Sequence, residues 1–194
     1  MSDDPYVYPG TAVLRNKFDL QDAARLDYEE RFFSTQRAAE GVPSGDFDLA
    51  HLQAIHHHLF QDVYAWAGQL RSLEISKGGH QFMFRQYILT GMADVHKRMR
   101  AANYLKGMAV RDFAHEAGKI IGDVNYVHPF REGNGRTQLL YLQQLCEKAG
   151  HNLDLRAINR NAWMDASRAA NTTDYGPMGW VIGAALGRAG RRLY

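Results

Sequence analysis

The segment from His128 to Arg136 contains the residue types that could do chemistry, and it reads HPFREGNGR. The imidazole of His128 titrates near neutrality and can serve as a general base. A residue that precedes proline disfavours helical geometry, so Pro129 predicts that a helix ends at His128. The imidazole is then expected at the end of that helix, where it can meet a substrate.

The second half of this segment predicts a compact loop that leads into another helix. Gly133 and Gly135 tolerate positive φ and let a ligand approach closely, and Asn134 is the other residue most tolerant of such geometry. The free N–H groups and the positive dipole end of the following helix favour phosphates, and Arg136 adds a fork of donors on its first turn. Glu132 fits beside this anion site if a divalent cation bridges its carboxylate to phosphate.

Helices are expected to position this loop, because apolar residues recur at helical spacing along most of the chain. The cleanest amphipathic pattern covers residues 110–127, directly before the loop, and a helix from about Arg136 to Ala149 follows it. Further helices are predicted from an N-cap at Asp19 to about Ala39, from Phe47 to about Val63 with Asp48 at the start, from Tyr87 to Leu105, from Leu155 to Ala170, and from Pro177 to the C-terminus.

Two segments depart from the helical pattern. Residues 1–19 combine prolines with aromatic residues, which predicts an arm laid over the body. Residues 70–84 are β-prone on both sides of Lys77-Gly78-Gly79-His80, which predicts a hairpin. A chain of 194 residues without an internal repeat is expected to form one all-α domain over residues 1–194, with this hairpin beside the loop at 128–136.

Charge and cysteine content exclude several classes of protein. A net charge of +2, from 23 basic and 21 acidic side chains, gives no strong basic footprint and does not imply direct binding of nucleic acid. The single cysteine, Cys146, lies among apolar residues and indicates a buried thiol in a reducing compartment. No leader segment and no apolar run long enough to cross a bilayer is present, so we expect a cytoplasmic protein without membrane contact.

HPFREGNGR resembles the active-site signature of Fic proteins, HxFx(D/E)GNGRxxR, and matches it at every defined position except the last. The resemblance extends to Asp4-Pro5-Tyr6, to Tyr64-Ala65-Trp66-Ala67-Gly68 and to the predicted hairpin. It implies a Fic-type helical domain that transfers AMP from ATP to a Tyr, Ser or Thr hydroxyl of another protein.

The resemblance also implies a role for each residue of the loop. His128 would deprotonate the incoming hydroxyl, and Glu132 would hold Mg²⁺. The amides of Gly133 and Gly135, together with Asn134, would cradle the nucleotide phosphates. Arg136 would bind the leaving pyrophosphate portion, and Phe130 would plug the core and fix the loop.

The hairpin at residues 70–84 resembles the flap of that family, whose edge takes up the target segment by strand addition. Lys77 and Phe82 are the candidate binding residues there. The family's inhibitory pattern, [S/T]xxxE[G/N], is not found, because Gln36 precedes Glu40 at the required spacing. Resemblance to the toxin–antitoxin branch then implies restraint by a small separate antitoxin, and a DNA gyrase or topoisomerase IV subunit as the target.

Leu139 stands where the family signature has its last arginine, and two interpretations of this position remain open. Either the chain has lost a phosphate ligand, or the leucine belongs to the apolar stripe of its helix. Two other functions also remain open. One is transfer of another phosphate-containing group, against which the arginine of GNGR argues, and the other is a binding module that has lost catalysis.

Other histidines and the tryptophans of the chain are interpreted as structural residues. His56-His57-His58 are adjacent on a predicted helix, so their side chains point in different directions and are not expected to share a metal. Trp66, Trp163 and Trp180 lie in apolar helical contexts and are expected in the core.

Overall fold

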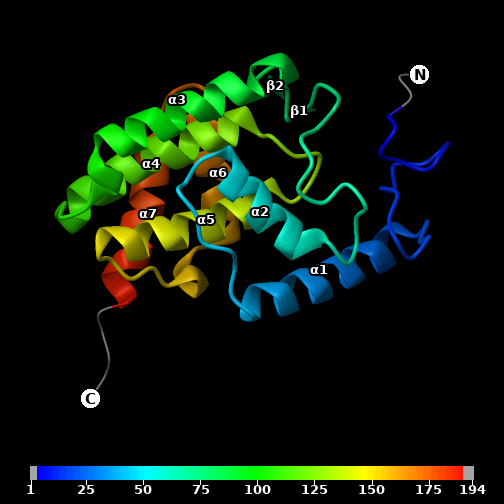
Figure 1. Cartoon of the computed structure of the whole chain (residues 1–194), viewed down its shortest axis with the longest axis horizontal. Coiled ribbons are helices and arrows are strands. Elements are labelled where there is room, and N and C mark those ends of the chain that lie inside the picture. The colour runs from blue at the N-terminus through cyan, green and yellow to red at the C-terminus, as the bar shows by residue number, and fades with distance from the viewer. Residues whose placement is uncertain (1–3, 190–194) are drawn as a thin grey trace.

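Helices form the body of the protein in the computed structural model, which describes residues 4–189 (Figure 1). In chain order the elements are α1 (Ala23–Ala39), α2 (Leu49–Phe60), β1 (Ser76–Lys77), β2 (His80–Gln81), α3 (Ile88–Ala101), α4 (Val110–Val127), α5 (Asn134–Ala149), α6 (Arg160–Ala170) and α7 (Gly176–Ala189). Single 3₁₀ turns occur at Arg85–Tyr87, Asn103–Leu105 and Leu155–Ala157. The predicted all-α fold with one small hairpin is confirmed.

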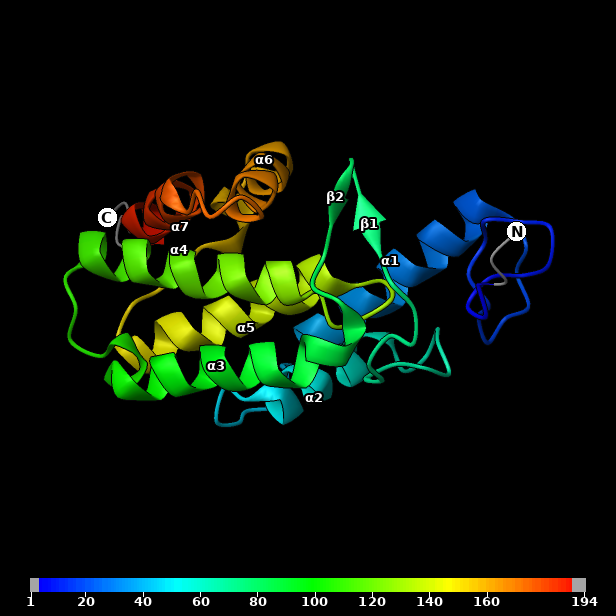
Figure 2. The ribbon, with the colours of Figure 1, turned by 90° about the horizontal axis from the view of Figure 1, so that it is seen from above.

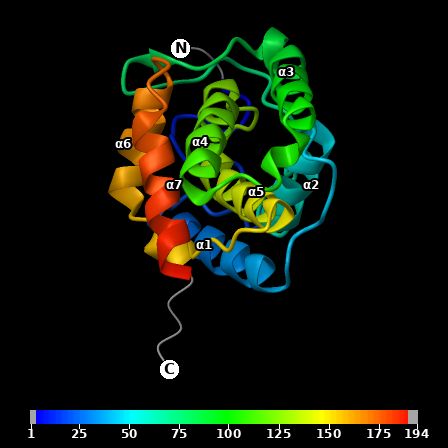
Figure 3. The same ribbon diagram turned by 90° about the vertical axis from the view of Figure 1, so that its left-hand side faces the viewer.

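Helix α4 is the centre of the molecule, because it contacts α3, α5, α6 and α7. Viewed along its length, α4 lies beside α5, with α2 and α3 on one side and α6 and α7 on the other (Figure 3). Its apolar face is fully buried through Phe113, Ala117, Ile121 and Val124. The amphipathic pattern of residues 110–127 predicted the bounds of this helix.

Close packing of α4 against α7 depends on a pair of glycines. A Cβ atom on Gly118 would lie 2.7 Å from the backbone nitrogen of Gly179, well inside van der Waals contact. The two backbones therefore approach each other where neither residue has a side chain. This contact holds α4 close to α7. It therefore also helps to position the active-site loop at the C-terminal end of α4.

The N-caps show one correct and one incorrect prediction. Asp48 caps α2 as predicted, since its carboxylate accepts a hydrogen bond of 2.8 Å from the amide of His51. The predicted cap at Asp19 is wrong, because α1 begins at Ala23 with Asp22 as its cap. The side chain of Asn16 bonds the amides of Phe18 and Leu20, which folds this stretch into a turn and delays the helix.

Other predicted boundaries also change. Helix α3 ends at Ala101, since residues 103–105 have positive φ and form a 3₁₀ turn. Helix α6 begins at Arg160, where the side chain of Asn159 accepts from the amides of Asn161 and Ala162, and α5 begins two residues before the predicted Arg136. Helix α7 is followed to Ala189, and the last predicted residues, 190–194, lie outside the described range.

The three tryptophans do not share one environment. Trp163 is buried as predicted, and Trp66 is partly buried against the core. Trp180 was expected in the core and is 71% exposed on α7, so that prediction is wrong. The reason is its place on the helix, because the neighbouring Met178, Val181 and Ile182 occupy the buried face.

The N-terminal arm and the flap hairpin both lie at the active-site end of the bundle. Asp4 pairs with Arg131 at 2.9 Å, and the hydroxyl of Tyr6 accepts a hydrogen bond from the amide of Ser72. The hairpin projects from the bundle (Figure 2) and is shorter than the predicted segment, with two residues in each strand. Ser76 pairs with Gln81, and Lys77 with His80.

Among residues 4–189, every helix is too short or too polar to cross a bilayer.

Candidate active site

His128 lies at the point where α4 ends. It has φ 46° and ψ 62°, and its amide still donates to the carbonyl of Val124 at 3.1 Å. The imidazole Nδ1 lies 3.2 Å from the carbonyl oxygen of Asn125. Because a carbonyl can only accept, Nδ1 carries the proton in the neutral ring and Nε2 keeps its lone pair. Nε2 is therefore the atom that can receive a proton.

The surroundings of His128 favour the neutral ring. Phe82 of the flap stacks on the imidazole with ring centroids 3.7 Å apart. Burial, assisted by the positive charges of Arg71 and Lys77 and opposed by the carbonyl of Asn125, lowers the pKa of His128 to about 4. The residue remains partly exposed, which limits the desolvation penalty. At neutral pH the ring is uncharged and available as a base.

The loop after His128 is held from within by Asn134. Its amide oxygen accepts from the N–H of Phe130 at 3.0 Å, and its amide nitrogen donates to the carbonyl of Phe130 at 2.8 Å. The side chain is therefore directed into the loop, where it bonds Phe130. The sequence predicted that Asn134 helps to cradle the nucleotide phosphates. Because its side chain bonds Phe130, only its backbone amide can contribute to that cradle.

His56 of α2 holds the loop by a hydrogen bond and by ring stacking. Its Nδ1 accepts from the amide of Gly68 at 2.8 Å, which leaves Nε2–H to donate to the carbonyl of Glu132 at 2.9 Å. The fully buried ring of Phe130 stacks on it, with centroids 3.9 Å apart. Burial lowers the pKa of His56 to about 4, so this histidine is also neutral. The expectation that the three adjacent histidines serve structure agrees with this position.

The start of α5 offers an open anion site. Gly133 has φ 80°, and a Cβ atom there would lie 2.4 Å from the ring of Phe60, so no other residue fits. Gly135 on the first turn is exposed, and a Cβ atom there would have no neighbour within 4 Å. The surface of this turn at Gly135 is therefore open, which suits close approach of a phosphate.

Arg136 is held by α1. Its guanidinium donates to Glu30 and, at 3.1 Å, to the hydroxyl of Ser34, while it lies over the ring of Phe60 at 4.6 Å from the centroid. The hydroxyl of Tyr64 donates to the other oxygen of Glu30. The predicted phosphate ligand is therefore already engaged with a buried carboxylate.

Glu132 projects from the surface of the loop. One of its carboxylate oxygens accepts from the amide of Gly133 at 2.9 Å. Within residues 4–189, no group of three or more His, Cys, Asp or Glu side chains is arranged to hold a metal. The site nevertheless fits Mg²⁺, because this cation is often bound through one carboxylate together with substrate phosphates and waters.

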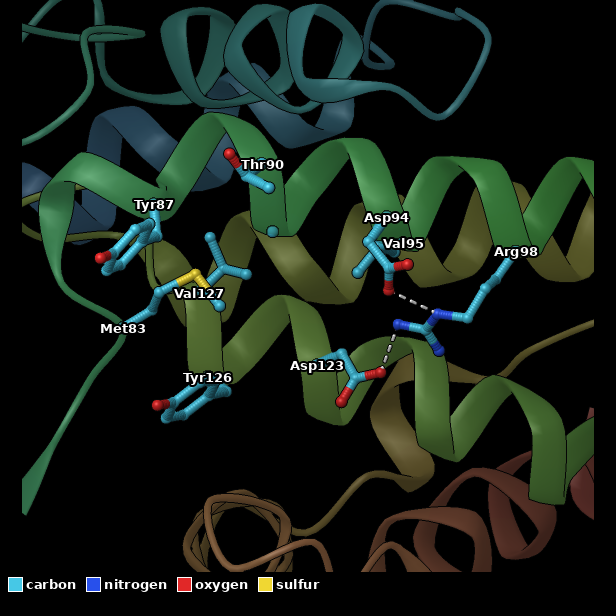
Figure 4. Close-up of a pocket in the computed structure, with 10 residues that line it drawn as sticks. Met83, Tyr87, Thr90, Asp94, Val95, Arg98, Asp123, Tyr126 and Val127 are labelled. Carbon is cyan, nitrogen blue, oxygen red and sulfur yellow. Dashed lines mark hydrogen bonds and ion pairs between the residues drawn. The ribbon is translucent and has the colours of Figure 1, made fainter.

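The flap brings Lys77 close enough for its charge to act on His128. Beside the base of the flap lies a pocket of about 370 Å³ between α3 and α4. Met83 and Val127 form its apolar wall, with Tyr126 at the rim, and Arg98 bonds both Asp94 and Asp123 at the other end (Figure 4). The pocket adjoins the active-site loop because Val127 directly precedes His128.

Three residues that support the active-site loop were not predicted from the sequence: His56, Glu30 and Arg71. Arg71 is buried, and it donates to the carbonyl of His128 at 2.8 Å from 57 residues away. Its only signal was its place in the β-prone segment, next to a leucine in LRSLE. Glu30 gave no signal, since it lies in a charged run of α1.

Comparison with known proteins shows the family of this chain. Residues 46–146 match the family model described as Fic/DOC family. The probable protein adenylyltransferase y4lH of Sinorhizobium fredii is 39% identical over 91% of this chain and 92% of its own length. The probable protein adenylyltransferase Fic of Escherichia coli K12 is 30% identical over 96% of this chain and 94% of its own.

Solved structures give the same fold. The BepC protein of Bartonella tribocorum with bound AMPPNP superimposes with a TM-score of 0.85 at 26% identity, over 93% of this chain and 95% of that one. An N-terminal Fic domain from Bartonella quintana with bound ADP gives 0.86, also at 26% identity, over 93% and 94% of the two chains. The family model and the relatives together show that this chain belongs to the Fic/DOC family as a protein adenylyltransferase.

Proposed function

We propose that this enzyme uses residues 128–136 to transfer AMP from ATP to a Tyr, Ser or Thr hydroxyl of a bacterial target protein. The observation that carries the proposal is the neutral His128, whose Nε2 is free to take a proton, next to the open first turn of α5. A base and a phosphate site adjoin each other on one rigid loop.

The reaction needs one proton acceptor. The target hydroxyl oxygen attacks the α-phosphorus of ATP, its proton passes to Nε2 of His128, and the bond to the β-phosphate oxygen breaks to release pyrophosphate. A new phosphoester joins AMP to the target. Catalysis of such transfers depends on positioning and charge stabilisation, and we propose that the amide of Gly135 binds the phosphates, joined by that of Gly133 once Glu132 turns from it to the cation.

Glu132 would hold Mg²⁺, which neutralises charge on the phosphates when it is bound. Arg136 would bind the leaving pyrophosphate portion. Its bonds to Glu30 and Ser34 use part of a five-donor fork, and about a third of its side chain stays exposed. Glu30 then fixes the plane of the guanidinium while the remaining donors meet phosphate.

The target is proposed to bind along the flap, where β2 and the neighbouring Phe82 lie over His128. Strand addition there would register the modified residue by backbone bonds. The pocket between α3 and α4 lies beside this path and can receive an apolar side chain of the target. We propose a type II topoisomerase subunit as the target, in a cytoplasmic setting.

Restraint is proposed to come from a small separate antitoxin protein. Residues 1–194 contain no [S/T]xxxE[G/N] pattern, so an inhibitory helix of that form would come from outside this sequence, and we propose a separate protein as its source. Purified enzyme alone should then modify its target without activation.

The proposal is tested by incubating the enzyme with ATP and purified gyrase or topoisomerase IV subunits, followed by mass spectrometry of the target. We expect the mass of one adenylyl group on a hydroxyl side chain. A phosphoryl, uridylyl or phosphocholine adduct would identify a different transfer, and no adduct on any protein of a bacterial lysate would favour a binding module. Excess chelator should abolish the modification, and full turnover without free divalent metal would contradict the role of Glu132.

A further inference from the structure

Arg71 joins three separate segments around the candidate base. Its guanidinium donates to the carbonyls of His128 and Leu73, each at 2.8 Å, and to that of Met83. A longer bond of 3.4 Å reaches the carbonyl of Val127. These acceptors come from the end of α4, from the segment that leads into β1 and from the segment that follows β2.

The side chain of Arg71 is completely buried, and the position is paired on its backbone as well. The amide of Arg71 donates to the carbonyl of Pro129 at 2.9 Å. Glu74, which is partly exposed, lies 3.3 Å from the guanidinium and balances its charge. Burial lowers the pKa of Arg71, but an arginine keeps its proton under these conditions.

The contacts of Arg71 coincide with the places where His128 needs support. A helix leaves its last carbonyls without partners, and a cation at that end binds them favourably. His128 adopts a left-handed conformation that a bulky residue rarely takes, and it keeps this conformation only if its surroundings fix it. Arg71 bonds the carbonyls of Val127 and His128, and it also bonds Met83, the neighbour of the Phe82 ring that covers the imidazole.

We propose that Arg71 is a positioning residue for AMP transfer: it fixes the left-handed backbone of His128 and ties that backbone to the flap, so that Nε2 faces the incoming hydroxyl. The proposal rests on the proposed role of His128 as the base. Arg71 itself contacts neither nucleotide nor target in this arrangement. Its loss should therefore lower kcat and leave the KM for ATP nearly unchanged.

Two variants separate the geometry of Arg71 from its charge. Arg71→Lys keeps a positive charge but cannot reach carbonyls in three directions with one ammonium group. Arg71→Met removes both the fork and the charge. Arg85→Met is the matched control, because Arg85 contacts the same carboxylate of Glu74 from the exposed surface. Within residues 4–189, Arg85 forms no hydrogen bond with α4.

We expect kcat to fall about tenfold to a hundredfold in both Arg71 variants, as misplacement of a catalytic group by about 1 Å typically does. The Arg85→Met control should keep wild-type kcat. Loss of the nearby charge should also raise the pKa of His128 in Arg71→Met, whereas Arg71→Lys should leave it near the wild-type value. The other groups that act on this ring are Lys77, the Asn125 carbonyl and the Phe82 face, and neither variant alters their chemical identity.

The pKa of His128 is measured by NMR titration of the free protein, with the resonance assigned by its absence from His128→Ala. This readout does not depend on transfer activity, so it distinguishes failure of the Arg71 proposal from failure of the proposed function. Folded Arg71 variants with wild-type kcat would overturn the proposal, as would an unchanged His128 pKa in Arg71→Met. If Arg71→Met does not fold, kcat of Arg71→Lys relative to Arg85→Met decides the matter by the same criterion.

Discussion

His128 and His56 carry the same side chain in opposite roles. Both rings have a pKa lowered to about 4, mainly because burial disfavours the charged form. Both ring nitrogens of His56 form hydrogen bonds within the protein. In His128 the hydrogen bond to the Asn125 carbonyl uses Nδ1, and Nε2 keeps its lone pair. Only His128 can exchange a proton with a substrate. Negative phosphates beside it raise its pKa, which makes it a stronger base when ATP is bound.

Leu139→Arg tests the one position where the loop departs from the family signature. Leu139 is partly buried and packs against the core, three residues beyond Arg136 on α5. A long arginine stem can keep this packing while its guanidinium reaches the first turn. We expect kcat/KM for ATP to rise about tenfold, the effect of one charged hydrogen bond to phosphate.

Gln143→Arg is the matched control for this gain, because it adds the same charge one turn further from the loop. It should leave the ATP kinetics unchanged. If Leu139→Arg instead melts at lower temperature without any gain in kcat/KM, Leu139 belongs to the core and Arg136 is the only arginine of the signature that serves the phosphates.

Sequence reasoning found the loop residues because they are consecutive. Pro129 signalled the end of α4 and Gly133 signalled the left-handed turn, and each effect is local to one or two residues. Arg71 and Glu30 act on the loop across 57 and 106 residues of sequence. Such partners depend on how helices pack, and a single sequence carries no local signal for that.

Among the helices, α4 was the best predicted, because its apolar residues follow one stripe over five turns. The start of α1 was misplaced since the decisive hydrogen bonds come from Asn16, outside the helix itself. The flap was found by its turn residues, but its two-residue strands are shorter than the β-prone segment. Local periodicity therefore predicts the middle of an element better than its ends.

Gly118→Ala tests the close contact between α4 and α7. The new methyl group would lie 2.7 Å from the backbone of Gly179, and backbone atoms cannot move aside cheaply. We expect a loss of about 1–3 kcal/mol in the free energy of unfolding, typical of overpacking in a core. Urea denaturation followed by circular dichroism measures this loss.

Gly183→Ala provides the comparison on the same interface. A Cβ atom there would meet the Cβ of Ala114 at 3.4 Å, which is an ordinary contact, and alanine favours a helix more than glycine does. This variant should be neutral or slightly stabilising. If the two variants have the same free energy of unfolding, α4 and α7 can move apart without a loss of stability.

At the scale of the whole molecule, the bundle, the arm and the flap converge on one end of α4 (Figure 2). The sequence predicted an all-α domain from composition and periodicity, but it did not predict that α1 would supply Glu30 and Ser34 to Arg136. Exposed Trp180 shows the same limit. Which face of a helix is buried follows from all its neighbours together.

His56 makes the stability of the whole fold depend on pH. Its pKa is about 4 in the folded protein and near 6.5 in the unfolded chain, so between these values the unfolded state binds more protons. The stabilisation is complete above about pH 6.5 and is lost as the pH falls toward 4. For this fully buried ring the pKa difference corresponds to roughly 3 kcal/mol.

His56→Gln should flatten the dependence of unfolding free energy on pH between about 6.5 and 4, because glutamine does not titrate and can still donate to the carbonyl of Glu132. Exposed His57 on the same helix serves as the reference, and His57→Gln should keep the wild-type slope. Parallel curves for wild type and His56→Gln would contradict the buried, neutral state of His56.

The central claim is that His128 is the base in a transfer of AMP, and it is tested most directly with ATP labelled either at the α-phosphate or at the γ-phosphate. Wild-type enzyme should label its target only from the α-position. His128→Ala should fold normally and lose about a hundredfold to ten-thousandfold of this rate, while His57→Ala keeps it. Labelling from the γ-position, or undiminished α-labelling by folded His128→Ala, would contradict the claim.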